Sequence, residues 1–140
     1  EVGGFDERFR GPEDYDLWMR IAAKHAVMRT GTELTRYRAV AGSLSMDDRT
    51  FLPQVLQVLD KAFGAGGALD NLQHMRRTAQ AAQYFSASWM AFNRGDRQAA
   101  VRHLLRSFRL SPSGMKPGRG GVALFVLQLF RYMFGKFRST

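Results

Sequence analysis

Apolar residues recur at intervals of three or four positions along much of the chain, the spacing of helices that bury one face. Leu17 and Ile21 show this spacing after Pro12 and an acidic first turn, which predicts a helix over about 14–24. The same spacing predicts helices over 50–63, 69–93 and about 97–109. Asn93-Arg94-Gly95-Asp96 breaks the pattern between the last two, so we expect a helical hairpin there.

Two short segments have the character of strands. They are Val27-Met28 and Leu34-Thr35-Arg36-Tyr37-Arg38, with Gly31 as the turn between them. The chain is therefore predicted to be mainly α, with one short β element. We divide it into residues 1–48, an α-helical tail with the hairpin over 49–112, and a basic amphipathic C-terminal helix over 113–140.

Two features of the helices predict how they pack. Small side chains would let the two helices of the hairpin approach closely; these are Ala79, Ala82, Ala87, Ala99 and Ala100. Leu17 and Trp18 are placed on the inward face of the first helix and are expected to be core residues.

Residues 118–140 combine an apolar run with basic flanks. The run from Val122 to Phe130 is too short to cross a membrane, because a spanning helix needs about 20 apolar residues. Two alternatives remain open. The segment is an in-plane membrane helix, or it is a last helix that covers an apolar patch of the protein, which we favour because a continuously apolar helix is typically buried.

The composition narrows the classes of partner. The 140 residues carry a net charge of +9 and contain no cysteine, which excludes disulfides and thiolate metal sites and suits a reducing compartment. Asp and Glu concentrate in the first 16 residues, Arg is scattered through helical stretches, and no nucleic-acid-binding motif is visible. We therefore expect no specific nucleic-acid partner. An anionic membrane surface or the phosphates of a substrate explain the charge as well.

The chain begins at Glu1 without an initiator Met or a signal peptide. We expect it to be a piece of a longer, cytoplasmic protein. If residues 118–140 bind lipid, the protein would lie peripherally at the inner face of the membrane.

Acidic side chains gather where the Gly-Pro turn meets the first predicted helix. They are Asp6, Glu7, Glu13, Asp14 and Asp16. Negative charge complements a helix N-terminus, the interpretation that we favour for Asp16. A metal site is a second interpretation, although His25 lies at the far end of the helix and is expected to face solvent. The third is a general base that faces a cleft.

Four motifs occur in a fixed order. They are Gly3-Gly4-Phe5-Asp6-Glu7, Glu13-Asp14-Tyr15-Asp16-Leu17-Trp18-Met19-Arg20, Tyr37-Arg38 and Gly42-Ser43-Leu44-Ser45. This series resembles the C-terminal part of a family 2 glycosyltransferase of the GT-A fold, over about residues 1–48. The resemblance implies a remnant of the acceptor side of an α/β GT-A domain, followed by an α-helical tail. Such an enzyme transfers a sugar, with inversion, from a nucleotide-diphosphate donor to a glycan or lipid-linked acceptor, for example in bacterial envelope polysaccharide biosynthesis.

The resemblance also implies roles for individual residues. Asp14 would be the base that deprotonates the acceptor hydroxyl, and Glu13 would line the acceptor pocket or orient Asp14. Gly11 would form the loop beneath them, and Gly4 would permit close backbone approach on the acceptor side. Arg38 would approach the donor phosphates, as would Arg20; a structural or solvated arginine is the commoner case.

Two departures from the family pattern concern the metal and the donor. Val40 stands where many relatives have a histidine that contacts the metal or the diphosphate, and no Asp-x-Asp motif is present in its metal-binding role. The resemblance implies a divalent cation, Mg or Mn, held in the full-length enzyme mainly by a nucleotide-binding half that this sequence lacks. We assign no metal ligand here and expect little activity from this chain alone. The alternative function is a helical membrane-surface or protein-interaction module.

Overall fold

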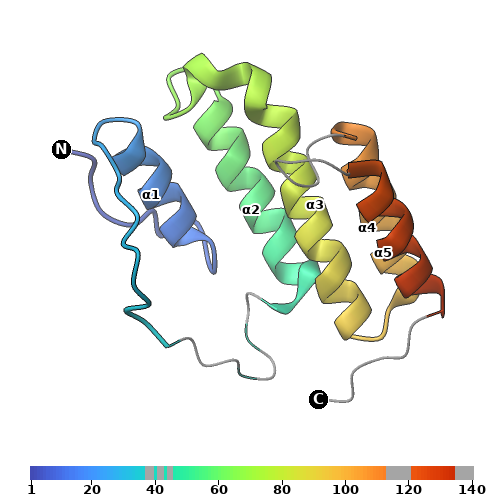
Figure 1. The fold of residues 1–140 in the computed structure, drawn as a ribbon. Helices are drawn as coiled ribbons and strands as arrows, with labels where there is room; N and C mark the ends of the chain where they lie inside the picture. Colours follow the sequence, from blue (N-terminus) through green and yellow to red (C-terminus); the bar gives the residue numbers. More distant parts are fainter. Residues whose placement is uncertain (37–39, 41–42, 44–45, 113–120, 135–140) are drawn as a thin grey trace.

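The computed structural model describes residues 1–36, 40, 43, 46–112 and 121–134, with the backbone alone for 121–126. Its helices are α1 (Glu13–Ala22), α2 (Asp48–Phe63), the 3-10 helix η2 (Asp70–Met75), α3 (Arg76–Asn93), α4 (Arg97–Leu110) and α5 (Gly121–Phe134). The α-helices pack in chain order, each against the next (Figure 1). The prediction of a mainly helical chain is confirmed.

Local side-chain chemistry sets the starts of α2 and α4. The Asp47 carboxylate accepts a hydrogen bond from the Arg49 backbone N–H at 3.0 Å, and Asp96 accepts one from the Ala99 N–H at 2.8 Å. These bonds satisfy donors that lack a partner in the first turn of a helix. Gly95 turns the chain between α3 and α4 with a φ of +92°, which glycine adopts without steric cost. The predicted helical hairpin is therefore confirmed.

The segment predicted as one helix over 69–93 is divided. Residues 70–75 form η2, and Leu72 leaves helical geometry with φ −114° and ψ 32° before α3 begins at Arg76. The apolar spacing alone did not reveal this kink, because the side chains keep a helical period on both sides of it.

Two clusters of buried side chains hold the helices together. One joins α3, α4 and α5 through Ala91, Phe92, Ala99, Ala100, Leu104 and Tyr132. The other joins α2 to α3 through Phe51, Leu52, Val55, Ala87 and Met90. Of the alanines predicted to allow close packing, Ala87, Ala99 and Ala100 are buried, whereas Ala82 is exposed and Ala81 is buried instead. The prediction for Ala82 was wrong by one helical position.

The β element predicted after α1 does not form in the described residues. Val27, Met28 and Leu34 lie in irregular, exposed backbone, and Tyr37 and Arg38 lie outside the described set. A strand needs a neighbouring strand to satisfy its backbone N–H and C=O groups. No strand lies beside these residues in the part of the chain that is described. Their β-forming side chains are therefore not sufficient to make a strand. The GT-A remnant itself stays a prediction.

Trp18 is the second correction. Its side chain is 57% exposed and lies 6.0 Å from the Tyr15 ring, measured between centroids. The face of α1 that is turned inward runs instead through Pro12 and Asp16, both buried, and through the partly buried Arg20. Leu17 is half-buried. The apolar period placed the inward face wrongly because the buried Asp16, with its ion pairs to Arg20 and Lys61, lies at the centre of that face.

Helix α5 accounts for part of the predicted C-terminal helix over 113–140. Tyr132 is buried in the α3–α4 cluster, and its hydroxyl lies 2.9 Å from Ser88 Oγ. A last helix packed on the protein, one of the two alternatives, is thus observed. Residues 113–120 and 135–140 lie outside the described set. Within the described chain, every helix is too short or too polar to cross a membrane.

Candidate functional site

The Gly-Pro turn before α1 is closed by a residue of the helix itself. Gly11 has a φ of +109°, a backbone conformation that favours glycine, whereas a Cβ there would make only ordinary contact with the Phe51 ring at 3.4 Å. Its N–H donates a hydrogen bond to the Glu13 carboxylate. Glu13 therefore has a structural role at the turn in addition to its predicted place in the acceptor pocket.

The Asp14 carboxylate lies half-buried in the first turn of α1. Its Oδ1 accepts a hydrogen bond from the Tyr15 backbone N–H at 2.8 Å. Among the described residues, Oδ2 has no hydrogen-bond partner. One oxygen is therefore anchored and the other is available to accept a proton, the arrangement that a general base needs.

An open hollow of about 520 Å³ lies beside this turn. Its lining includes Phe5, Asp6, Glu7, Arg10, Gly11 and Glu13. The structure thus brings two of the predicted residues, Gly11 and Glu13, to one concave surface. Asp14 follows Glu13 in the same helical turn but does not line the hollow.

The remaining predicted residues lie apart from this hollow. Gly4 is exposed, and its carbonyl accepts a hydrogen bond from Arg20 Nη2 at 2.8 Å. A Cβ at Gly4 would meet open space, so crowding does not require glycine there. Arg38 lies outside the described residues.

The Arg20 guanidinium is engaged in contacts within the protein. It donates to the backbone carbonyls of Val2 and Gly4 and pairs with Asp16 across one helical turn, Nη2 to Oδ2 at 2.7 Å. The structural alternative for this arginine is the one observed. His25 is exposed at the end of α1, as expected.

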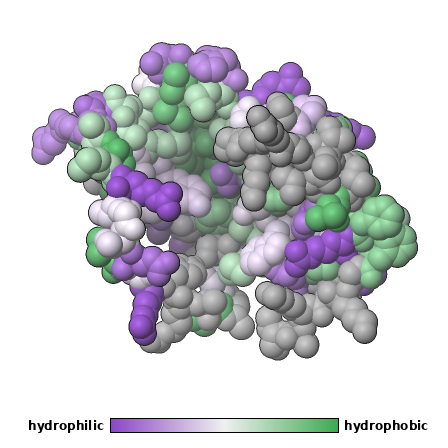
Figure 2. Space-filling view, viewed as in Figure 1, coloured by the Kyte–Doolittle hydropathy of each residue, from purple (hydrophilic) through white to green (hydrophobic). Residues whose placement is uncertain are grey.

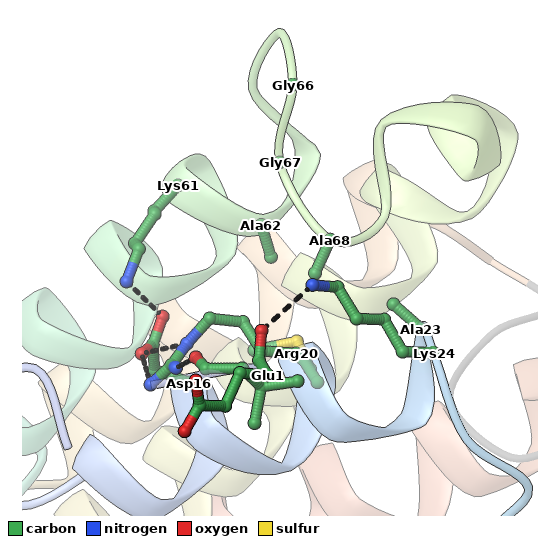
Figure 3. Close-up of a pocket in the computed structure, with 12 residues that line it drawn as sticks. Glu1, Asp16, Arg20, Ala23, Lys24, Lys61, Ala62, Gly66, Gly67 and Ala68 are labelled. Atoms are coloured by element: carbon green, nitrogen blue, oxygen red, sulfur yellow. Dashed lines mark hydrogen bonds and ion pairs between the residues drawn. The ribbon is translucent and has the colours of Figure 1, made fainter. Parts of the chain in front are cut away.

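A buried carboxylate behind the turn is neutralised from a second helix. Asp16 is 2% exposed, and Lys61 of α2 reaches its Oδ1 at 2.7 Å (Figure 3). Lys61 also pairs with Asp6 at 2.9 Å. Hydrogen bonds from Arg8 and Lys61 hold the pKa of the Asp6 carboxyl well below its usual range. The Asp6–Lys61–Asp16–Arg20 network links the segment before α1, α1 itself and α2.

The sequence analysis did not predict this network, although the sequence carries a signal for one of its pairs. Asp16 and Arg20 stand at i and i+4, a spacing that indicates a helical ion pair. Lys61 carries no such signal, because it meets Asp16 only through the packing of α2 on α1. The helix-terminus interpretation of Asp16 was incomplete for the same reason.

A second cavity, of about 270 Å³, lies on the other side of the network. It is formed by α1, the end of α2 and the Gly66-Gly67 loop (Figure 3). Lys61 and Arg20 are engaged with Asp16, and Lys24 donates to the Glu1 carbonyl at 3.1 Å. The cations of this cavity are already paired, so the hollow beside Glu13 is the better candidate for a substrate.

The described residues do not offer a metal centre, since no three His, Asp or Glu side chains among them converge closely enough to hold an ion. At the buried Asp48, for example, His103 lies 3.2 Å away and the guanidinium of Arg94 lies 2.9 Å away. The Arg94 guanidinium balances the charge of that carboxylate, and the His103 ring lies within hydrogen-bond distance of its other oxygen. The divalent cation that the resemblance implies stays a prediction.

Comparison with known families identifies one match. The model described as glycosyltransferase-like family 2 matches residues 1–89. The matched region contains the Gly-Pro turn, α1, α2, η2 and most of α3, and so extends beyond the motifs of residues 1–48. Searches of curated proteins and of solved structures return no match.

Proposed function

The chain belongs to the glycosyltransferase-like family 2, and we propose that it supplies the acceptor side of an inverting sugar transfer from a nucleotide-diphosphate donor. The observation that carries the proposal is the position of Glu13-Asp14. The pair lies within the matched region, at a loop-to-helix junction. Glu13 lines the hollow, and Asp14 follows it in the same turn, with an Oδ2 that has no hydrogen-bond partner among the described residues.

In the proposed reaction Asp14 acts as the general base. Its Oδ2 takes the proton of the acceptor hydroxyl while the hydroxyl oxygen forms a bond to the anomeric carbon of the donor sugar. The bond between that carbon and the diphosphate oxygen breaks, and the nucleoside diphosphate leaves with the electron pair. A single displacement of this kind inverts the anomeric configuration.

The neighbouring residues position the base and the acceptor. Glu13 holds the turn through the Gly11 N–H, which fixes the backbone from which Asp14 projects. Gly11 and Glu13 present the concave surface to a glycan or lipid-linked acceptor. Gly4, which does not line the hollow, keeps its proposed role of close backbone approach on the acceptor side. Arg38 keeps its proposed place near the donor phosphates. Polysaccharide biosynthesis is the process that such an activity would serve.

An Asp14→Asn variant tests the proposal. We would measure transfer with a panel of nucleotide sugars on the protein expressed from its complete gene, since the amide keeps the shape of Asp14 but cannot accept the proton. We expect kcat to fall by about 10²-fold or more, the usual contribution of a general base, while donor binding is unchanged.

Asp60→Asn is the matched control, because Asp60 is an exposed carboxylate of α2 that pairs with Arg76. It should transfer sugar at the parent rate. Full turnover by Asp14→Asn would reject Asp14 as the base.

A further inference from the structure

Helix α5 has one face on the protein and one face outside it. Tyr132 is buried, and Gln128 and Leu129 are half-buried against the other helices. Large apolar side chains lie on the opposite side; they are Leu127, Phe130, Met133 and Phe134, with exposed fractions of 70%, 63%, 52% and 70%. We call these four residues the outer face of α5.

The outer face is a continuous stripe. Leu127, Phe130 and Phe134 stand at i, i+3 and i+7, which places them above one another on a helix. The rings of Phe130 and Phe134 lie 5.5 Å apart between centroids. Figure 2 shows hydrophobic and hydrophilic side chains next to each other over the side of the molecule where α5 runs in Figure 1. Contiguous apolar stripes exposed to water are typical of surfaces that bind another protein, a membrane or a ligand.

The net positive charge of the chain lies in the C-terminal part of its sequence. Residues 97–140 contain nine Lys and Arg and no Asp or Glu, which equals the +9 of the whole chain. The first 96 residues are therefore balanced. Two of these cations are at α5: Arg131 is exposed on the helix, and Arg97 of α4 donates to the Met133 carbonyl at 3.2 Å. A second copy of the chain would bring the same positive charges to this helix, which disfavours self-association through it.

We propose that α5 binds in the plane of an anionic lipid surface. The outer face would insert at the boundary between headgroups and acyl chains, and Arg97 and Arg131 would lie at the phosphates. The 14 residues of α5 extend about 21 Å, less than the roughly 30 Å of a bilayer core, so the helix lies on the membrane rather than across it. This inference does not depend on the proposed glycosyl transfer.

Flotation with lipid vesicles tests the proposal on the full chain. We expect binding to vesicles of phosphatidylcholine mixed with phosphatidylglycerol, and binding at least about tenfold weaker to phosphatidylcholine alone, because each basic residue near the surface adds attraction. Raising the salt concentration should weaken binding to the anionic vesicles and leave binding to the phosphatidylcholine vesicles nearly unchanged.

A double variant, Phe130→Ser with Phe134→Ser, tests the outer face. Removing two exposed rings should weaken binding to the anionic vesicles by at least about tenfold. The matched control is Phe5→Ser with Trp18→Ser, which removes two aromatic side chains of similar exposure from the other end of the molecule. The control should bind like the parent chain. Circular dichroism would verify that both variants keep the helical content of the parent.

Three results would overturn the proposal. The first is equal binding to the neutral and anionic vesicles, which would remove the role of charge. The second is unchanged binding by the Phe130 and Phe134 variant. The third is a dimer in sedimentation velocity that this variant abolishes, in a chain that does not float with vesicles; the outer face would then be a contact between copies.

Discussion

Replacing Asp16 with Asn removes the charge at the centre of the ion-pair network while keeping the shape of the side chain. Asp16 is 2% exposed and accepts from Lys61 Nζ at 2.7 Å and from Arg20 Nε at 2.9 Å. An amide there leaves two cations without their shared buried partner.

The size of the stability loss depends on which partners Lys61 and Arg20 retain in the variant. Removing one member of a buried ion pair costs about 3–5 kcal/mol when the other is left without compensation. Here Lys61 retains Asp6, Arg20 retains backbone carbonyls, and both cations are partly exposed to water. We therefore expect Asp16→Asn to lower the free energy of unfolding by about 2–3 kcal/mol, a large part of the roughly 5–15 kcal/mol typical of a domain.

Urea unfolding followed by circular dichroism measures this loss, with Asp60→Asn as the matched control. Asp60 and Arg76 also join two helices at 2.7 Å, but the pair is exposed. Its removal should cost no more than about 0.5 kcal/mol, since solvent screens such pairs. If the two variants lose equal stability, burial does not strengthen the Asp16 network and the reasoning is refuted.

Three further predictions concern the same unfolding measurement. Gly67→Ala should lower stability by about 1–3 kcal/mol, because its Cβ would lie 2.3 Å from the Lys61 carbonyl oxygen, whereas Gly4→Ala, with open space around it, should change stability by less than about 0.5 kcal/mol. Tyr132→Phe should lower the free energy of unfolding by about 1 kcal/mol, since it removes the hydroxyl that contacts Ser88 in the core. An unchanged free energy of unfolding would show that this contact does not stabilise the fold. The hydrogen bond from the Arg49 side chain lowers the pKa of Asp47 from 3.8 to about 2. The stability that the ionised Asp47 contributes is therefore complete above the pKa of the unfolded chain and is lost as pH falls from about 4 to about 2. Asp47→Asn should make the free energy of unfolding fall less steeply over that pH range, and an unchanged slope would contradict the assignment.

The helices could be predicted from the sequence because their determinants are local. The apolar period of Phe51, Val55 and Leu59, the cap at Asp96 and the glycine at Gly95 each act within about one helical turn. The candidate site was found in part for the same reason. Gly11 and Glu13 share a hollow because they flank one proline, and the family match covers them.

The remaining features depended on contacts between segments far apart in the chain. Strand-forming residues at 27–36 made no strand in the described structure, because a strand requires a partner that composition does not supply. Trp18 is exposed and Asp16 is buried because Lys61, on another helix, compensates the carboxylate and allows α1 to pack through its polar face. Local propensity thus determined which residues are helical, whereas tertiary packing decided which face of each helix is inside, since only packing brings together charges that are distant in sequence.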